Sequence, residues 1–554
     1  MQKTAVNKND EWWKTGVIYQ IYPRSFMDSN GDGVGDLQGV IEKLDYLNDG
    51  TERSLGIDAI WLSPIFPSPM ADFGYDISNY CDIHPLFGNL AVFDKLITEA
   101  HKRAIKIILD FVPNHTSNLH PWFLESRSNR QNPKRDWYIW RDGKVDGSLP
   151  NNWGSAFGGP AWEWDEQTGQ YYLHSFLKEQ PDLNWRNPRV RNAMLDVLRF
   201  WLERGVDGFR MDVIGMILKD PDLRDNPLLI GDKTFSDDIN SYSQQEHLYD
   251  QDQDEVHVII REIRKVLDEY PQSVGIGELW YELPRWIRYY GANGDELQLP
   301  FNFRLMHIPW TARAVQGSVD EMEDALPDFA WSNYVLNNHD SPRLISKIGG
   351  GQARIAAILL LTLRGTPTLY YGEELGMENA MIDKNNMRDP QGFRLGAEKS
   401  RDPGRNPMQW TGDRYAGFST VEPWLPLAPD YQKKNVLAES NDPASMLSLY
   451  RKLIQLRKQQ PALQVGSYRA IQVKSPDCFV FERELADDRF LIALNFAANP
   501  VDLHLPGFSS GQMFLSTYLD RKDVLASDDL KLRENEGVII KIENTMHNPG
   551  MKNG

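Results

Sequence analysis

The sequence has few cysteines and no long hydrophobic run. Only Cys81 and Cys478 occur among 554 residues, and neither belongs to a cluster with metal-ligand spacing. This excludes a disulfide framework. The longest apolar run, Ile355 to Leu363, is shorter than the ~20 residues of a membrane helix, and the N-terminus lacks the apolar core of a signal peptide. We therefore expect a cytoplasmic protein with no membrane partner.

Positive charge is also scarce. The chain has 60 Lys and Arg against 78 Asp and Glu, a net charge of −18. This charge disfavours nucleic acid as a partner and favours a neutral or cationic one. The sequence contains no GxSxG serine motif, no P-loop, no dinucleotide GxGxxG after a strand and no zinc-type histidine cluster. The chemistry therefore has to come from carboxylates and histidines.

Apolar, β-rich runs alternate with helical segments along most of the chain. We expect strands at 17–22, 56–64, 104–115, 205–212, 273–278, 334–340 and 365–374, and helices at 37–47, 91–104, 188–204, 255–269, 316–325, 351–362 and 443–459. Such alternation, about eight times in all, predicts a parallel sheet. Because several strands end on carboxylates or histidines, it predicts a (β/α)₈ TIM barrel.

Two regions break this alternation. Residues 116–178 are rich in Trp, Asn, Gly and Pro, and are too long for a plain loop, so they predict a small inserted domain after strand 3. Residues 466–554 show short alternating runs, which predict a C-terminal antiparallel β-sandwich. The barrel would then comprise 1–115 and 179–465. Within it, the polar segment 219–254 is expected to be a long loop or a short helical insertion.

The stretch GVDGFRMD, residues 205–212, ends a strand on a charged pair. Strand side chains alternate between faces, so Arg210 and Asp212 should point the same way. An adjacent arginine favours the ionised form of the aspartate. An ionised carboxylate at a strand end can act as a nucleophile, but a purely structural ion pair would give the same pattern.

Acidic residues at three strand ends favour the nucleophile interpretation. Asp212, Glu278 and Asp340 each follow a predicted strand. Glycoside hydrolysis needs one ionised carboxylate and one with a raised pKa. Arg210 indicates that Asp212 is the ionised member, whereas the surroundings of Glu278 look more apolar and suit the protonated acid. Asp340 would bind sugar hydroxyls.

A metal site is predicted in DSNGDGVGD, residues 28–36. Side-chain oxygens come from Asp28, Asn30, Asp32 and Asp36, and Val34 can offer its carbonyl. The spacing resembles most of an EF-hand loop, although the twelfth position holds glycine instead of glutamate. We expect structural calcium, with magnesium as the alternative. An Asp-Gly turn that binds nothing is the other interpretation.

Several segments, in this order, resemble those of glycoside hydrolase family 13, the α-amylase family. The matching segments are GIDAIWLSP (56–64), DFVPNH (110–115), GFRMD (208–212), GELW (277–280), NNHD (337–340) and GTPTLYYGEE (365–374). Two others, QPDLNW (180–185) and RDPGRNPMQW (401–410), resemble the α-glucosidase and oligo-1,6-glucosidase subgroup. The loop at 28–36 resembles a calcium loop of this subgroup.

The resemblance implies roles for individual residues. Asp212 would be the nucleophile of a retaining reaction, Glu278 the acid/base and Asp340 the transition-state stabiliser, with the first two carboxylates roughly 5–5.5 Å apart. Asp72 and Arg405 would close the sugar pocket, which implies an exo-acting enzyme. The residues implied in substrate binding are Asp72, Tyr75, His115, Phe176, Arg210, His339 and Arg405.

The glucosidic linkage is left open by the sequence. Val213, directly after the predicted nucleophile, is associated by the resemblance with α-1,6 activity. The long connecting segments resemble those of bacterial α-glucosidases, which implies α-1,4 cleavage of short oligosaccharides such as maltose. One methyl-for-hydroxyl difference at Val213 discriminates weakly. Oligo-1,6-glucosidase, sucrose hydrolase or isomerase, and transglucosylation remain alternatives, and a non-catalytic binding protein is a remote one. We expect a monomer or a small homo-oligomer.

Overall fold

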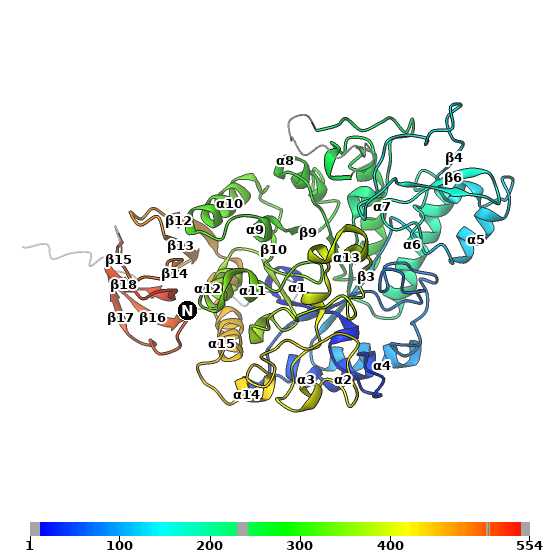
Figure 1. Ribbon diagram of the computed structural model, residues 1–554. Helices are drawn as coiled ribbons and strands as arrows, with labels where there is room; N and C mark the ends of the chain where they lie inside the picture. Colours follow the sequence, from blue (N-terminus) through cyan, green and yellow to red (C-terminus); the bar gives the residue numbers. More distant parts are fainter. Residues whose placement is uncertain (1–10, 230–241, 506–507, 509, 544–554) are drawn as a thin grey trace, which may run out of the picture.

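The chain folds around a closed barrel of eight parallel strands (Figure 1). The computed structural model describes residues 11–229, 242–505, 508 and 510–543. Around the barrel the strand order is β1-β11-β10-β9-β8-β7-β3-β2. The barrel strands are β1 (Ile18–Ile21), β2 (Ala59–Leu62), β3 (Lys106–Phe111), β7 (Gly208–Met211), β8 (Val274–Gly277), β9 (Leu299–Asn302), β10 (Asn333–Val335) and β11 (Thr366–Tyr370). The predicted (β/α)₈ barrel is confirmed.

Both faces of the barrel strands are buried, which explains their nearly continuous hydrophobic runs. In β2, Ala59 and Trp61 point into the barrel, where they join Ile108 and Phe301 in one apolar cluster. Their neighbours on the opposite face pack under the surrounding helices. The alternation of faces therefore separates a barrel interior from an outer core.

Helices follow most barrel strands and cover the outside of the barrel. The longer ones are α4 (Leu90–Lys102), α6 (Pro188–Glu203), α7 (Val256–Asp268), α10 (Ala312–Ala325), α12 (Gly350–Thr362) and α15 (Met446–Gln459). The shorter ones are α1 (Trp12–Thr15), α2 (Leu37–Glu42), α3 (Leu44–Leu47), α5 (Pro121–Ser128), α8 (Leu283–Trp286), α9 (Arg304–His307), α11 (Leu344–Ile348), α13 (Pro390–Leu395), α14 (Val436–Ser440) and α16 (Pro461–Val465). The single helix expected at 37–47 is two helices, because Lys43 leaves the helical conformation.

Strand β9 is the barrel strand for which no sequence range was predicted. Its four residues, LPFN, are all buried and show no polar alternation. Pro300 lacks a backbone donor, which argues against a central strand. The barrel nevertheless uses it, with Pro300 in register with Gly277 of β8.

Two antiparallel parts are attached to the barrel, as expected. After β3, the chain forms a three-stranded sheet from β4 (Trp140–Arg141), β6 (Gln170–Leu173) and β5 (Trp162–Asp165). At the C-terminal end, β12 (Ser467–Ile471), β13 (Cys478–Leu485), β14 (Asp488–Asn495), β19 (Gly537–Ile542), β16 (Ser510–Ser516) and β17 (Leu525–Ser527) form a six-stranded sheet, and β15 (Val501–His504) pairs with β18 (Asp529–Leu532). The residue boundaries of the domains stay predictions.

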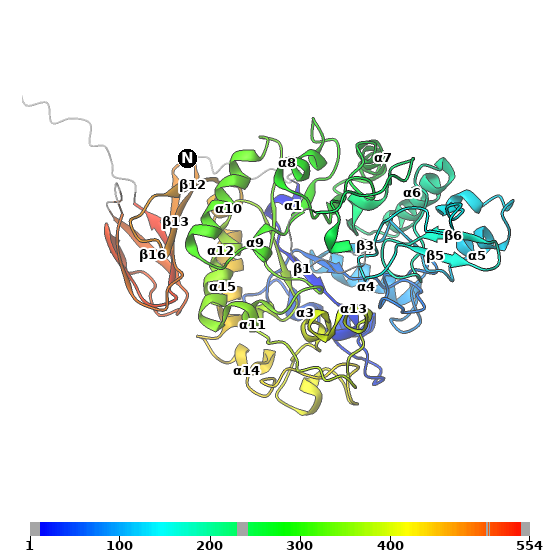
Figure 2. The same ribbon diagram turned by 45° about the horizontal axis from the view of Figure 1, so that its top comes forward.

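Helix α12 lies between the barrel and the C-terminal sheet (Figures 1 and 2). A helix that is covered on both sides is apolar all round, and its residues from Ile355 to Thr362 are all buried. Ile355 and Ile358 lie against Gly537 of β19. This explains why the longest apolar run of the sequence is a helix at an internal junction.

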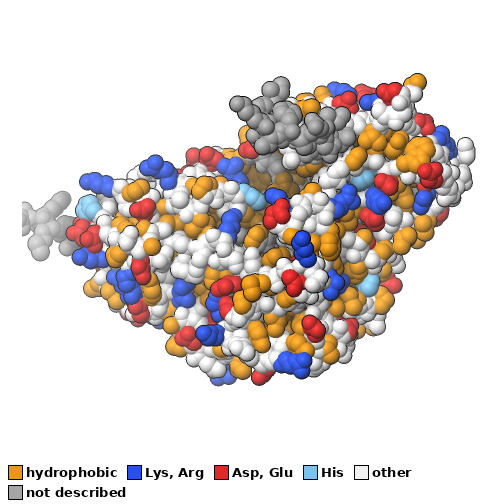
Figure 3. Space-filling model, viewed as in Figure 1, with side chains coloured by type: hydrophobic (Ala, Val, Ile, Leu, Met, Phe, Trp, Pro, Cys, Tyr) orange, Lys and Arg blue, Asp and Glu red, His pale blue; other side chains and the backbone are white. Residues whose placement is uncertain are grey.

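The described residues contain no helix that is both long and apolar enough to cross a membrane. On the face shown in Figure 3, acidic and basic side chains are interspersed. The negative charge is therefore not gathered into one patch on that face.

Candidate active site

Catalytic candidates meet in a cavity of about 540 Å³ at the C-terminal ends of the barrel strands. Asp212 directly follows β7 and Glu278 directly follows β8, while Asp340 lies on the loop after β10. All three line the cavity, together with four of the seven predicted sugar-binding residues, Asp72, Tyr75, His115 and Phe176. This is the end of a TIM barrel where active sites lie.

Arg210 connects three carboxylates beneath this cavity. Its Nη1 donates to Asp110 Oδ1 at 2.8 Å and to Asp212 Oδ1 at 2.8 Å, and its Nη2 donates to Glu278. Its side chain is only 1% exposed. The expectation that Arg210 and Asp212 share a face is confirmed, but Arg210 supports the floor of the cavity and is not one of its lining residues.

The ionisation of Asp212 differs from the expectation. Burial raises its pKa well above the usual range, Arg210 opposes this effect, and the nearby Glu278 and Asp110 carboxylates add to it. Because Arg210 is shared with two other carboxylates, it offsets the burial of Asp212 only in part.

Glu278 lies in polar surroundings, so the apolar setting suggested by its sequence neighbours is wrong. Besides Arg210, the backbone N–H of Val213 donates to its Oε2 at 3.1 Å, and Trp280 Nε1 donates to its Oε1 at 2.9 Å. The neighbouring Gly277 and Leu279 are apolar, but barrel strands bring donors from other elements. The apolar residues next to Glu278 in the sequence were therefore a poor guide to its surroundings in the fold.

His339 is held as a neutral ring below Asp340. Burial lowers its pKa to about 3, and its ring stacks on Tyr75 at 5.5 Å between centroids. Gln20 Nε2 lies 2.7 Å from Nδ1, and Tyr75 Oη lies 2.7 Å from Nε2. With Gln20 donating, the ring donates to Tyr75, which in turn donates to Asp110 at 3.0 Å. His339 therefore positions Tyr75 and does not line the cavity.

Asp340 is an ionised carboxylate that remains accessible from the cavity. Burial opposes its ionisation, but the charges around it, among them Arg401 and Arg405, outweigh burial and lower its pKa below the usual range. Arg405 Nη2 lies 2.8 Å from Oδ1, and Arg401 Nη1 lies 3.4 Å away. Its side chain is still 30% exposed, so it can accept hydrogen bonds from a ligand.

Arg401, and not the Arg405 expected to close the sugar pocket, lies with Asp72 at the cavity. Asp72 Oδ1 accepts from Arg401 Nη2 at 2.8 Å, whereas Arg405 donates to Asp340 and to the carbonyl of His339. Arg401 lines the cavity, and Arg405 is buried behind it. Arg401 directly precedes the short 3₁₀ turn Asp402–Arg405 and Arg405 is its last residue, so the two side chains point in different directions. The signal for Arg401 was present in RDPGR, which contains both arginines.

Three further cavity residues had no predicted role. Gln180 Nε2 donates to Asp72 Oδ2 at 3.2 Å and lies 3.1 Å from His115 Nε2. Phe157 packs on Phe176, and Trp280 stacks on Phe303 at 4.3 Å with 49% of its surface exposed. Gln180 and Trp280 lie within the motifs QPDLNW and GELW, so the motifs contained this information.

The predicted calcium loop has the oxygen-rich composition that calcium prefers. In the structure, Asp28 accepts backbone N–H groups of Asn30, Gly31 and Gly33, and Asp36 caps α2 by accepting from Gly39. Among the described residues, no three His, Cys, Asp or Glu side chains are grouped as metal ligands. The donor chemistry fits calcium, and the calcium site stays a prediction.

The fold is a TIM barrel, and its cavity brings together carboxylates from several strand ends. These two features define a class of barrel hydrolases that use carboxylates as catalytic groups. Residues 20–466 match the alpha amylase catalytic domain, and the chain belongs to this family, glycoside hydrolase family 13, within its α-glucosidase and oligo-1,6-glucosidase subgroup. It is therefore a glycoside hydrolase of the α-glucosidase type, acting on α-glucosides.

Similar proteins match nearly the whole chain. A probable alpha-glucosidase of Rhizobium meliloti (strain 1021) is 41% identical over 530 residues, which is 92% of this chain and 95% of the relative. An oligo-1,6-glucosidase of Parageobacillus thermoglucosidasius is 40% identical over 96% of this chain and 99% of the relative. The structure of XgtA, an alpha-glucosyl transfer enzyme, superimposes with a TM-score of 0.89 at 41% identity, covering 96% of this chain and 99% of that one.

Proposed function

We propose that this enzyme is a retaining, exo-acting α-glucosidase that releases glucose from the non-reducing end of short oligosaccharides such as maltose. The observation that supports it best is the combination of Asp212, Glu278 and Asp340 in one cavity with the Asp72–Arg401 ion pair. The ion pair offers two charged groups to the outer hydroxyls of a terminal glucose. A longer chain could not continue past it.

In this mechanism Asp212 is the nucleophile and Glu278 is the acid. Glu278 donates a proton to the glycosidic oxygen while an Asp212 oxygen bonds to C1 and the C1–O bond breaks. Water then attacks C1 of the glucosyl–Asp212 ester, and Glu278 takes its proton back, so retention follows from two inversions. Another sugar hydroxyl in place of water would give transglucosylation.

The reaction requires Asp212 to be ionised and Glu278 to carry a proton. In the free enzyme, burial raises the pKa of Asp212, and Arg210 opposes this effect. Positive charge develops at C1 beside Asp212 as the bond breaks, which favours the ionised form of Asp212. Glu278 is the group that gives its proton to the leaving oxygen. Asp340, ionised by its arginines, stabilises the same positive charge.

A second candidate is preference for the α-1,6 linkage. Val213 lines the cavity directly after the nucleophile and adopts a left-handed conformation, with φ of 37°. Its N–H donates to Glu278, so this residue borders both the acid and the leaving group. The α-1,4 linkage stays our first proposal because a single side chain discriminates weakly.

The experiment is a comparison of maltose, isomaltose, sucrose and trehalose with wild type and Asp212→Asn, with products identified. We expect α-glucose from maltose as the first product, and loss of turnover by about 10⁴-fold or more in the variant because the nucleophile is gone. Asp207→Asn, an aspartate of the loop before β7 that pairs with Lys106, is the control. Wild-type-like turnover by Asp212→Asn would overturn the nucleophile role. Rapid endo-cleavage of long starch would overturn the exo mode.

A further inference from the structure

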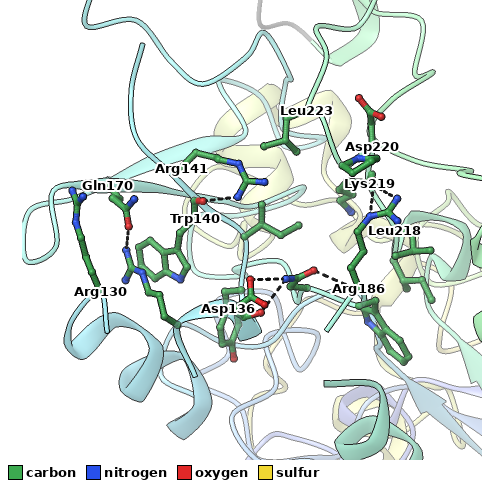
Figure 4. A pocket seen from close by; sticks show the side chains of 17 residues that line it. Arg130, Asp136, Trp140, Arg141, Gln170, Arg186, Leu218, Lys219, Asp220 and Leu223 are labelled. Atoms are coloured by element: carbon green, nitrogen blue, oxygen red, sulfur yellow. Dashed lines mark hydrogen bonds between the residues drawn. The ribbon is translucent and has the colours of Figure 1, made fainter. Parts of the chain in front are cut away.

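A second cavity, of about 570 Å³, lies between the inserted sheet and the segment that follows β7. Residues of β4 and β6 form one wall, and residues 217–223 form the other. Figure 4 shows Arg141 on the side of the inserted sheet, facing Arg186 and Lys219 on the opposite side. It shares no lining residue with the catalytic cavity.

The walls of this cavity are basic, although the chain carries a net charge of −18. The cationic lining residues are Arg130, Arg135, Arg141, Arg186 and Lys219, against the two aspartates Asp136 and Asp220. Asp220 is already paired with Arg224 outside the cavity lining, and Asp136 accepts from Asn184. Three of the cations also have acidic partners: Arg130 pairs with Asp142, Arg186 with Glu255 and Lys219 with Asp182. The excess positive charge of the cavity therefore lies on Arg135 and Arg141.

Two of the arginines have no carboxylate partner in the part of the chain that the structure describes. Arg141 Nη1 donates to its neighbour's carbonyl, Trp140 O, at 2.8 Å, and its guanidinium is exposed. Arg135 lies 3.5 Å over the ring of Trp140 and donates to Ser126 O and Gln170. Burial lowers the pKa of Arg135 to about 10. An anion would complement these uncompensated charges.

The shape and chemistry of the cavity select the kind of anion. Guanidinium groups match phosphate oxygens in geometry. The volume lies in the range of pockets for small organic ligands and far exceeds a bare ion. A neutral sugar would need an exposed aromatic face, but Trp140 and Trp185 are 6% and 1% exposed. We propose that this cavity binds a small organic phosphate monoester, with Arg141 and Arg135 holding its phosphate group.

The position of this cavity connects it to the catalytic one. Val213 and Met216 line the catalytic cavity, and residues 217–220 of the same short segment line the second. Lys219 anchors the segment, with Nζ 2.8 Å from Asn114 Oδ1 and 2.9 Å from Asp182 Oδ2. Because Val213 donates to Glu278, a ligand that shifts this segment is expected to change KM or kcat.

The test titrates glucose 6-phosphate, inorganic phosphate and glucose separately into the full-length enzyme at constant ionic strength, with Tm and heat of binding as readouts. We expect saturable binding of glucose 6-phosphate, weaker binding of phosphate, and a change in KM or kcat for p-nitrophenyl α-glucoside. In Arg141→Gln with Arg135→Gln, affinity for both phosphate compounds should fall at least about ten-fold. The response to glucose, which reports the catalytic cavity, should stay.

Two controls keep the result interpretable. Arg141→Gln alone changes an exposed side chain and should fold normally while losing most of the phosphate affinity. Arg199→Gln, an arginine of α6 paired with Glu269 outside the cavity, should bind like wild type. Equal glucose 6-phosphate binding by wild type and the double variant would overturn the site. Binding without any change in KM or kcat would overturn the coupling.

Discussion

At the scale of single residues, one guanidinium commonly serves several carboxylates in this enzyme. Arg210 connects Asp110, Asp212 and Glu278, and Arg401 connects Asp72, Asp340 and Asp389. In each group the arginine sets both the position and the ionisation of the acids. The protonation pattern of the site therefore belongs to clusters and cannot be assigned from one Arg–Asp pair.

Replacement of Arg401 by lysine tests its role at the sugar end of the cavity. An ammonium group cannot reproduce the planar fork that reaches three carboxylates. We expect kcat/KM for p-nitrophenyl α-glucoside to fall about 10- to 100-fold, mainly through KM. Arg388→Lys, an exposed arginine outside the cavity, is the matched control. An unchanged kcat/KM in Arg401→Lys would show that the Asp72–Arg401 pair does not hold the sugar.

At the scale of elements, buried acids join neighbouring segments. Glu373, in the 3₁₀ turn after β11, accepts from Tyr450 Oη of α15 at 2.9 Å. Burial raises its pKa from 4.5 to about 8. Glu439, at the α14 end, shows the same direction, with burial raising its pKa to about 7. Such buried acids stay protonated at pH values at which exposed acids are ionised. The packing between the helices and turns that contain them therefore depends on pH.

The predicted pH dependence has a definite sign. Between pH 4.5 and about 8 the folded state holds a proton on Glu373 that the unfolded state has released. The free energy of unfolding should therefore fall as pH rises through this window, by about 1–3 kcal/mol for this group. Glu373→Gln, which cannot titrate, should flatten the dependence of Tm on pH. Glu398→Gln, an exposed control, should keep the wild-type slope; an equal slope in Glu373→Gln would refute the assignment.

The loop at 28–36 leads to a second prediction at this scale. We propose that it binds calcium, which would stabilise the folded state by mass action, about 2.7 kcal/mol at a hundred times Kd. Calcium should raise Tm and EDTA should lower it, and Asp32→Ala should abolish both responses. Asp49→Ala removes an aspartate from another Asp-Gly turn, one that accepts from Thr51, and should respond like wild type. A Tm that is insensitive to calcium would leave the loop as a turn.

At the scale of the whole molecule, the barrel and the C-terminal sheet share one junction around α12. Arg483 of β13 donates to the carbonyls of Thr362, Leu463 and Gly466, and Arg457 of α15 donates to those of Leu361 and Gly365. Burial lowers the pKa of Arg483 to about 9. These arginines satisfy carbonyls at the C-terminal ends of α12 and α16.

Loss of Arg483 should weaken this junction without altering the chemistry. Arg483→Met leaves several buried carbonyls without a donor, so we expect a loss of about 3 kcal/mol in the free energy of unfolding. The exposed Arg469→Met in the adjacent strand β12, which pairs with Glu482, should cost much less. Denaturant unfolding measures the difference, and kcat/KM at 25 °C should stay unchanged. Equal stability of the two variants would contradict the role of the junction.

The sequence by itself determined the strand and helix alternation, the acids at the strand ends and the family. These are local properties, because hydrophobic period, strand-end residues and short motifs can be recognised in neighbouring residues of the sequence. Strand β9 was not predicted because its four residues, one of them proline, are all buried and show no alternation of apolar and polar side chains.

Only the tertiary structure decided which charges meet. It placed Arg401 beside Asp72 at the cavity, gave Glu278 three donors, and divided Arg210 among three acids. These contacts join residues from different strands and loops, and their pKa values depend on burial and on every neighbouring charge. Arg210 and Asp212 share a face because strand side chains alternate, but the raised pKa of Asp212 depends on its burial in the closed barrel and on carboxylates from other strands.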